Sequence, residues 1–140
     1  YDSIILLIPL HKNPRVREPL NKILKGHQRI LLSEPLDYDK LISVLKSCKF
    51  VITDSGGLQE EAPAFGKPVL VIRNSTERVE AIEAGCAKLI GTEKDNILKE
   101  SMTLINKPEK YNEMSKIKNP FGIGDSSEKI FNETLKFLKL

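Results

Sequence analysis

The sequence predicts an α/β domain in which helices cover both faces of a parallel, doubly wound sheet. Short apolar runs alternate with amphipathic segments along most of the chain, as expected for strands joined by crossover helices. The apolar runs are continuous, which is typical of parallel strands that are covered on both faces. The length of 140 residues and the hydrophobic content of 40% fit a single domain over residues 1–140.

Five apolar runs are predicted to be strands. Each is short, rich in Ile, Leu or Val, and followed by polar or glycine residues that end it. Ligands of such sheets bind beyond the carboxyl ends of the strands, so we expect the functional residues there. The predicted strands are residues 4–8, 29–32, 50–53, 69–72 and 88–90.

The segments between and after these strands show helical periodicity. In residues 15–25, the apolar side chains Val16, Leu20, Ile23 and Leu24 recur at the spacing of one helix face. One further helix is expected after the glycines at 56–57 and another after Thr76. The remaining predicted helices are residues 38–47, 96–106, 109–117 and 127–140.

Composition excludes several classes of function. The net charge of +3 comes from scattered lysines without arginine clusters, so nucleic acid is not an expected partner. Cys48 and Cys86 form no CxxC pair and the chain has two histidines, so we expect no metal site, no disulfide and no cofactor. The first apolar run is too short for a membrane span and follows the acidic Asp2, which favours a cytoplasmic protein without a membrane partner.

The most informative stretch is residues 50–85, where a strand meets the turn Asp54-Ser55-Gly56-Gly57 and then a helix. The first N–H groups of a helix have no partner inside the helix, and glycines without Cβ atoms let a phosphate approach them. Each hydrogen bond to a charged oxygen contributes about 1.5–3 kcal/mol. An ordinary helix cap by Ser55 explains the same residues equally well.

His11 follows the first strand directly and precedes Pro14, which suits the first position of a helix. We therefore expect His11 at the crevice, where it could bind a phosphate oxygen or assist the departure of a leaving group. A histidine in a loop is equally compatible with a simple surface position.

The fourth strand is followed by Thr76-Glu77-Arg78, in which Thr76 is a candidate helix cap. The positive end of a helix dipole disfavours an arginine, so Arg78 calls for an anionic ligand or a carboxylate partner. Glu77 is the carboxylate partner that the sequence suggests. Both alternatives remain open at this stage.

Two glutamates follow the glycine turn. Glu61 lies one helical turn beyond Gly57 and suits hydrogen bonding to ribose hydroxyls, as acidic residues do in dinucleotide sites. Glu60 is expected to be a solvated acid that the helix dipole stabilises.

Four blocks of the chain resemble, in order and spacing, the C-terminal half of the non-hydrolysing UDP-N-acetylglucosamine 2-epimerases. The resemblance covers almost the whole chain, and its SGG, QEEAP and TER motifs are specific. The blocks are HKNPRVREPL, TDSGGLQEEAPAFGKPVLVIRNSTERVEAIEAG, LIGT and NPFGIGD.

The resemblance implies a three-layer, Rossmann-like domain that forms most of the C-terminal half of a two-domain, GT-B-type fold. It assigns His11 to catalysis beside the diphosphate, Ser55 and Gly56 (with Gly57 beside them) to phosphate, Glu61 to the ribose and Arg78 to the nucleotide pocket. It assigns Leu41 to the uracil, at a position where relatives often have an aromatic residue, and this departure would weaken stacking on the base. Val79, Phe121 and Ile123 also depart from the family pattern.

The reaction that the resemblance implies interconverts UDP-N-acetylglucosamine and UDP-N-acetylmannosamine by eliminating and re-adding UDP. Such chemistry needs a base at C2 and stabilisation of the departing diphosphate. In the family the carboxylates at C2 come from the N-terminal domain, which this chain lacks together with the first strand and helix of the C-terminal domain. The isolated chain is therefore expected to be inactive, and a homodimer of the full-length protein is compatible with the sequence.

Two other classes of function remain open from the sequence. The first is the donor-binding domain of a GT-B glycosyltransferase, which would bind a similar anionic donor. The second is a non-catalytic module that keeps an affinity for UDP.

Overall fold

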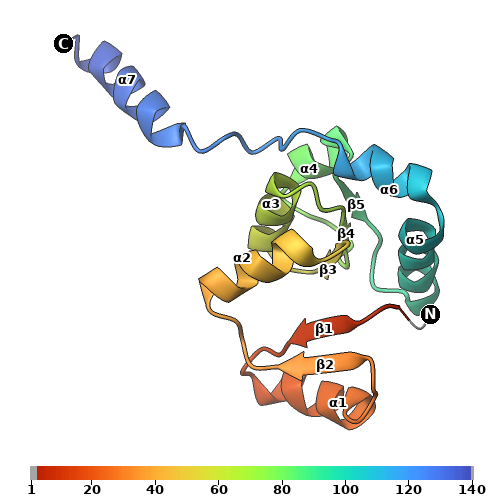
Figure 1. Ribbon diagram of the computed structural model, residues 1–140. Coiled ribbons are helices and arrows are strands. Elements are labelled where there is room, and N and C mark those ends of the chain that lie inside the picture. The colour runs from red at the N-terminus through yellow and green to blue at the C-terminus, as the bar shows by residue number, and fades with distance from the viewer. Residues whose placement is uncertain (1–2, 140) are drawn as a thin grey trace. The chain divides into compact units, whose positions relative to one another are not determined.

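The computed structural model describes residues 3–139 and confirms the α/β class with parallel strands (Figure 1). The chain divides into two compact units, Tyr1–Val44 and Leu45–Leu140. The elements in chain order are β1 (Leu6–Pro9), α1 (Pro14–Leu24), β2 (Ile30–Ser33), α2 (Tyr38–Ser47), β3 (Val51–Thr53), α3 (Gly56–Ala64), β4 (Val69–Val71), α4 (Val79–Ala84), β5 (Ala87–Leu89), α5 (Lys94–Asn106), α6 (Pro108–Ser115) and α7 (Ser126–Leu138).

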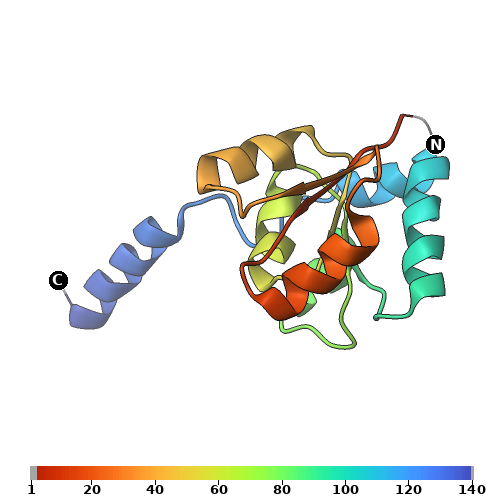
Figure 2. The same ribbon diagram turned by 90° about the horizontal axis from the view of Figure 1, so that it is seen from below.

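The first unit contains a two-stranded parallel sheet, with α1 as the connection between its strands (Figure 2). Leu6 lies opposite Ile30, and the first strand begins two residues later than predicted because the Leu6 N–H is the first to reach a carbonyl across the pair, that of Arg29, at 2.9 Å. The helix begins at Pro14, whose ring presets the backbone angle of a first helical residue.

Burial in the first unit is low. Leu10 is 4% exposed, whereas Leu6 and Leu31 of the two strands are 43% and 51% exposed. The expectation that every strand is covered on both faces is therefore wrong for β1 and β2 within the described residues. The predicted apolar face of α1 is also narrower than expected, because Val16 and Ile23 are exposed.

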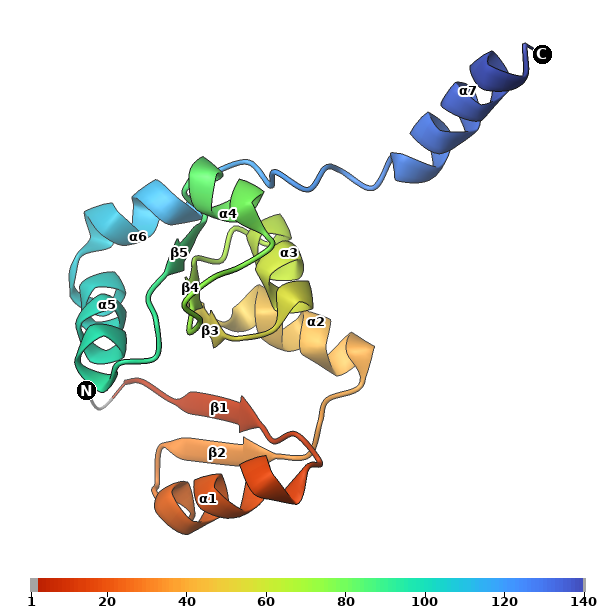
Figure 3. The same ribbon diagram turned by 180° about the vertical axis from the view of Figure 1, so that it is seen from behind.

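The second unit contains a three-stranded parallel sheet in the order β3-β4-β5 (Figure 3). The central strand β4 is buried along its whole length, as predicted for a strand covered on both faces. The sequence suggested one sheet of five strands. Among the described residues the strands pair as two separate sheets, because β1 pairs only with β2 and β3 only with β4.

Helices cover both faces of the sheet in the second unit, so that this unit has three layers. Helix α3 packs against β3 and β4. Leu70 of β4 and Ile90 pack with Leu104 of α5, and the α6 residue Met114 lies against this cluster. Side chains alternate along a strand, so Leu70 and its neighbours Val69 and Val71 point to opposite faces.

Most predicted helices are found within one or two residues of their expected bounds. Helix α2 matches its prediction at both ends, and α5 begins two residues earlier, at Lys94. The predicted end of the last helix at residue 140 lies outside the described residues, and α7 ends at Leu138. Within residues 3–139, no helix combines the length and apolar character needed to cross a membrane.

Candidate anion-binding site

The turn from β3 into α3 leaves the hydroxyl group of Ser55 unused. Ser55 has extended backbone angles (φ −78°, ψ 130°) at the N-cap position, but its side chain makes no capping hydrogen bond. The Ser55 N–H instead donates to the hydroxyl of Thr53 at 3.0 Å, which shapes the turn. The structure thus does not support the ordinary helix cap, and an exposed hydroxyl stands at the start of the helix.

The first backbone N–H groups of α3 are also open. Gln59 is the first residue of this segment whose N–H reaches a carbonyl, that of Ser55, at 3.4 Å. Within residues 3–139, the N–H groups of Gly56 and Gly57 have no hydrogen-bond partner. A Cβ atom at position 57 would meet only the Ser55 hydroxyl oxygen, at 3.8 Å. The helix end therefore presents several donors to an anion.

Arg78 lies against this helix end. A Cβ atom on Gly56 would be 3.3 Å from both Cζ and Nη2 of Arg78. The guanidinium can lie this close to the backbone of α3 because position 56 has no side chain. Arg78 is the residue just before α4 and occupies its N-cap position without a side-chain cap. The structure thus places an arginine beside the open N–H groups, within one unit of the chain.

Two carboxylates neutralise Arg78. Its Nε donates to Glu60 at 2.6 Å, and its Nη1 lies 3.0 Å from Glu77. The Glu77 partner was expected, whereas the prediction of a merely solvated Glu60 is wrong. The loop before α4 returns to the first turns of α3, which brings Arg78 within reach of that carboxylate.

Glu77 is shared between two arginines. Its second oxygen accepts from Arg73 at 3.2 Å. Hydrogen bonding from its own backbone, followed by the charges of Arg73 and Arg78, holds the pKa of Glu77 below its ordinary value. The two arginines and the two glutamates cancel in charge, so the open helix N-terminus is the uncompensated positive feature here.

A buried amide connects the two loops of the site. Gln59 is 0% exposed, and its Nε2 donates to the Ser55 carbonyl at 3.2 Å. Its Oε1 accepts the hydroxyl proton of Thr76 at 2.6 Å. Thr76 in turn accepts the N–H of Arg78 at 3.1 Å, so it shapes the loop before α4 and is not the helix cap that the sequence suggested.

Glu61 lies one residue beyond the Glu60–Arg78 pair and is partly buried. Its side chain forms no hydrogen bond or ion pair with another described residue. Its ribose-binding role stays a prediction.

His11 and Leu41 belong to the first unit. The Nδ1 atom of His11 accepts the N–H of Asn13 at 3.1 Å, so the neutral ring carries its proton on Nε2. The side chain is exposed, and its Nε2 atom has no hydrogen-bond partner among the described residues. Leu41 lies in the first turn of α2 and is partly buried.

A charged clamp holds the backbone around His11. Arg17 donates to the carbonyls of Leu10 and His11 at 3.4 and 3.5 Å. The same guanidinium forms two hydrogen bonds to Glu34, at 2.8 and 2.7 Å. The hydrogen bonds from Arg17, followed by its charge, lower the pKa of Glu34.

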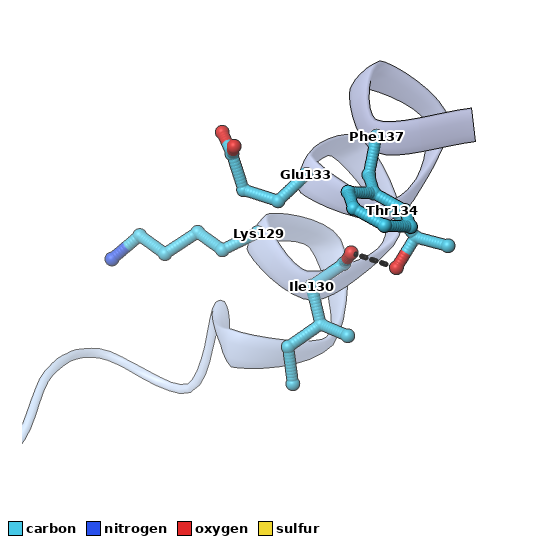
Figure 4. Close-up of a pocket in the computed structure, with 5 residues that line it drawn as sticks. All are labelled: Lys129, Ile130, Glu133, Thr134 and Phe137. Atoms are coloured by element: carbon cyan, nitrogen blue, oxygen red, sulfur yellow. Dashed lines mark hydrogen bonds between the residues drawn. The ribbon is translucent and has the colours of Figure 1, made fainter. Parts of the chain in front are cut away.

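A pocket along α7 has a different character from the anion-binding site (Figure 4). All of its lining residues come from this one helix, and its hydroxyl is already used, because Thr134 donates to the carbonyl of Ile130 at 2.8 Å. It presents no open backbone donors. The lining residues are Lys129, Ile130, Glu133, Thr134 and Phe137.

Sequence reasoning missed three contributors to these sites: Gln59, Glu60 and Arg17. A signal for Gln59 exists, because the buried residues of α3 are Gln59, Ala62 and Pro63, spaced as one helix face. A polar residue on a buried face requires partners. Nothing local marks Glu60 or Arg17, whose partners lie 18 and 17 residues away along the chain.

Parallel strands, a glycine-opened helix with free N–H groups and a neighbouring arginine together define an α/β protein of the phosphate-binding type. The chain can be assigned to a narrower group within that class. It belongs to the UDP-N-acetylglucosamine 2-epimerase family, whose sequence model matches residues 1–135.

Curated relatives agree with this membership. The chain is 47% identical over 134 residues to the UDP-N-acetylglucosamine 2-epimerase of Campylobacter jejuni. The aligned region covers 96% of this chain and 35% of that relative. It is 42% identical over 136 residues to the enzyme of the same name from Escherichia coli strain K12, covering 97% and 36%. The chain thus spans about a third of the length of these relatives.

Solved structures show the same fold. A UDP co-structure of S. aureus MnaA matches 100% of this chain and 38% of its own chain, with 48% identity and a TM-score of 0.95. The UDP-GlcNAc 2-epimerase from Neisseria meningitidis, solved with UDP-GlcNAc bound, matches 97% of this chain and 37% of its own, with 44% identity and a TM-score of 0.93. The Rossmann-like, GT-B-type fold class predicted from the sequence is confirmed.

Proposed function

We propose that the chain is most of the C-terminal, UDP-binding domain of a UDP-N-acetylglucosamine 2-epimerase. The complete protein would interconvert UDP-N-acetylglucosamine and UDP-N-acetylmannosamine by eliminating UDP and adding it back with C2 inverted. The observation that carries the proposal is the open N-terminus of α3 beside Arg78, in a chain that belongs to this family. The solved relatives that contain UDP or UDP-GlcNAc support the choice of ligand.

The chain's own residues stabilise the leaving diphosphate in this proposal. The hydroxyl of Ser55 and the N–H groups of Gly56 and Gly57 donate to phosphate oxygens, and the Nη2 group of Arg78, which lies beside Gly56, adds a further donor. Donors aimed at a departing anion lower the barrier because the negative charge on UDP grows during the elimination.

His11, Glu61 and Leu41 complete the proposed set of ligand-binding residues. The Nε2–H of His11 can donate a hydrogen bond to an oxygen of the departing diphosphate and so assist its departure. Glu61 has a carboxylate without another partner among the described residues, which suits hydrogen bonding to a ribose. Leu41 would contact the uracil with a weaker interaction than an aromatic side chain gives.

The remaining half of the chemistry is assigned to a part of the protein outside this chain. Removing the proton at C2 needs a base, and we propose that carboxylates of an N-terminal domain provide it. The span of about a third of the relatives' length supports this division. The exposed apolar residues Leu6 and Leu31 on the β1–β2 sheet are also expected where more of the same protein packs.

We further propose that the protein works in the cytoplasm. Cys48 and Cys86 are both free thiols, as is usual in a reducing compartment. Burial raises the pKa of each thiol, which keeps it protonated and unreactive. A homodimer of the complete protein stays a prediction.

Calorimetric titration with UDP tests the pocket. We expect Ser55→Ala and Arg78→Ala each to weaken UDP binding by about tenfold or more, because each removes a hydrogen bond to a charged oxygen. Arg78→Ala should have the larger effect, since it also leaves Glu60 without its ion-pair partner and removes one of the two partners of Glu77 beside the anion. Ser127→Ala, at an exposed position of α7, is the matched control and should bind as the wild type does. Equal affinities for UDP in the wild type and the three variants would show that the UDP pocket is not at this position.

Activity measurements test the division of labour. The purified 140-residue chain should not convert UDP-N-acetylglucosamine to its C2 epimer, whereas the complete protein should. Conversion by the isolated chain would show that the base lies within it. Transfer of the sugar to an acceptor without inversion at C2 would point to a glycosyltransferase instead.

A further inference from the structure

We propose that Gln59 is a positioning residue that holds Arg78 at the N-terminus of α3 for recognition of the diphosphate. This inference rests on the proposed function, because it assigns a role within the same UDP site. It concerns a residue that contacts no ligand in the proposed mechanism and acts through its neighbours.

Gln59 is fully buried although its side chain is polar. It shares the buried face of α3 with Ala62 and Pro63, where an apolar residue would satisfy packing alone. A buried amide is tolerated when both its donor and its acceptor are hydrogen-bonded. Both groups are bonded here, and each bond goes to a different loop of the site.

The hydrogen bonds form a single chain from one loop to the other. The Arg78 N–H donates to Thr76 Oγ1 at 3.1 Å, and the Thr76 hydroxyl donates to Gln59 Oε1 at 2.6 Å. At the other end of the amide, Nε2 donates to the Ser55 carbonyl at 3.2 Å. The hydroxyl of Thr76 has one proton, and Gln59 uses it, so the direction of every bond is determined.

The spacing between these loops matters because Arg78 approaches Gly56 closely. The guanidinium lies 3.3 Å from where a Cβ atom of Gly56 would be, and its Nε is bonded to Glu60 of the same helix. The Gln59–Thr76 bond ties the backbone just before α4 to α3 independently of the long Arg78 side chain. The buried link therefore fixes the anchor from which that side chain reaches the anion.

Substitutions at both ends of the link test the proposal in the complete protein that contains this chain. Gln59→Met keeps the length of the side chain and removes both hydrogen bonds, and Thr76→Val removes the hydroxyl without altering α3. We expect each to weaken UDP binding by about tenfold, the size of one hydrogen bond to a charged ligand group. Gln28→Met, at an exposed position, is the matched control and should leave the affinity unchanged.

A double-mutant cycle separates positioning from general stability. If Gln59 acts through Arg78, Gln59→Met should weaken UDP binding less than about twofold in a protein that already carries Arg78→Ala. Thr76→Ser keeps the hydroxyl and should retain nearly the wild-type affinity, even if Thr76→Val loses it. Should Gln59→Met fail to fold, the same cycle with Thr76→Val gives the answer.

The results distinguish this inference from the function on which it rests. Wild-type protein that binds UDP and is weakened by Arg78→Ala, but not by Gln59→Met or Thr76→Val, overturns the role of Gln59 and leaves the function standing. The same loss with and without Arg78 also overturns it, because the effect would then be independent of the arginine. Wild-type protein that does not bind UDP overturns both.

Discussion

Gly56 and Gly57 stand side by side at the start of α3 and have different surroundings. The position of a Cβ on Gly56 is 3.3 Å from the guanidinium of Arg78, whereas a Cβ on Gly57 would meet only the Ser55 hydroxyl at 3.8 Å. Both have ordinary helical backbone, because neither is among the glycines with positive φ. Both positions leave space for a neighbouring group, and at Gly56 the guanidinium of Arg78 already comes closer than an ordinary Cβ contact.

Gly56→Ala should weaken UDP binding by about threefold to tenfold, since the added methyl group pushes the guanidinium away by a few tenths of an ångström or more. Calorimetry measures the change. Gly57→Ala is the control, and in the protein without UDP it should leave the Arg78–Glu60 contact intact. Crystal structures of both variants would show the position of the Arg78 side chain. An Arg78 side chain that does not move in Gly56→Ala would contradict the expectation.

The Arg17–Glu34 pair shows how charge acts at the scale of an element. It joins α1 to the segment after β2 and holds the carbonyls of Leu10 and His11 after β1. Glu34 is exposed and Arg17 is partly buried, so solvent screens part of the attraction between their charges, and the main effect of the pair is on geometry. The loop that contains His11 is therefore fixed by side chains of α1 and of the segment after β2.

Acid should release this clamp. Glu34 has a pKa below its ordinary value in the folded chain, so its contribution to stability is present above the unfolded pKa of about 4.3 and is lost as the pH falls through the folded pKa. We expect Glu34→Gln to lower the melting temperature at about pH 7, and the difference from the wild type should be smaller at about pH 3, because Glu34 loses its charge as the pH falls through its folded pKa.

Thermal melts at the two pH values measure this difference. Glu18→Gln is the control, because Glu18 is at an exposed position of α1, the helix of Arg17. Its melting temperature should differ little from that of the wild type at either pH. A difference for Glu34→Gln that is as large at about pH 3 as at about pH 7 would mean that charge pairing is not its cause.

At the scale of the whole molecule, the two units differ in how much they bury. A cluster of buried apolar residues joins Leu70, Ile90 and Leu104 in the second unit. In the first unit, Leu10 is the single fully buried apolar residue among those described. The stability of the described chain therefore depends mainly on the second unit, which also contains the open end of α3.

Leu104→Ala should reduce the free energy of unfolding by about 2–5 kcal/mol, because it removes methyl groups from a packed cluster and leaves a cavity. Leu98→Ala on the same helix α5 is the control, since Leu98 is 57% exposed, and it should cost less than about 1 kcal/mol. Denaturant unfolding measures both. Similar losses in the two variants would show that the cluster is not the core of the unit.

The class of the fold and the place of the candidate site could be predicted from the sequence. The five strands and most helices lie close to their expected bounds, because hydrophobic periodicity and turn residues act over a few positions. The open helix end at Ser55, Gly56 and Gly57 was visible in the same way. The division of the strands into two sheets was not visible, since pairing depends on residues far apart in sequence.

The sequence by itself determined the α/β class, the glycine-opened helix and the family resemblance, because each is encoded in contiguous residues. Only the tertiary structure decided that the Ser55 hydroxyl is not a cap, that Glu60 pairs with Arg78 and that Gln59 connects the two loops. These contacts join residues 17 or 18 positions apart, and α3 must pack beside the loop before α4 for them to form. Packing between elements, which no local pattern encodes, gave the arginine its carboxylate partners and its place at the end of α3.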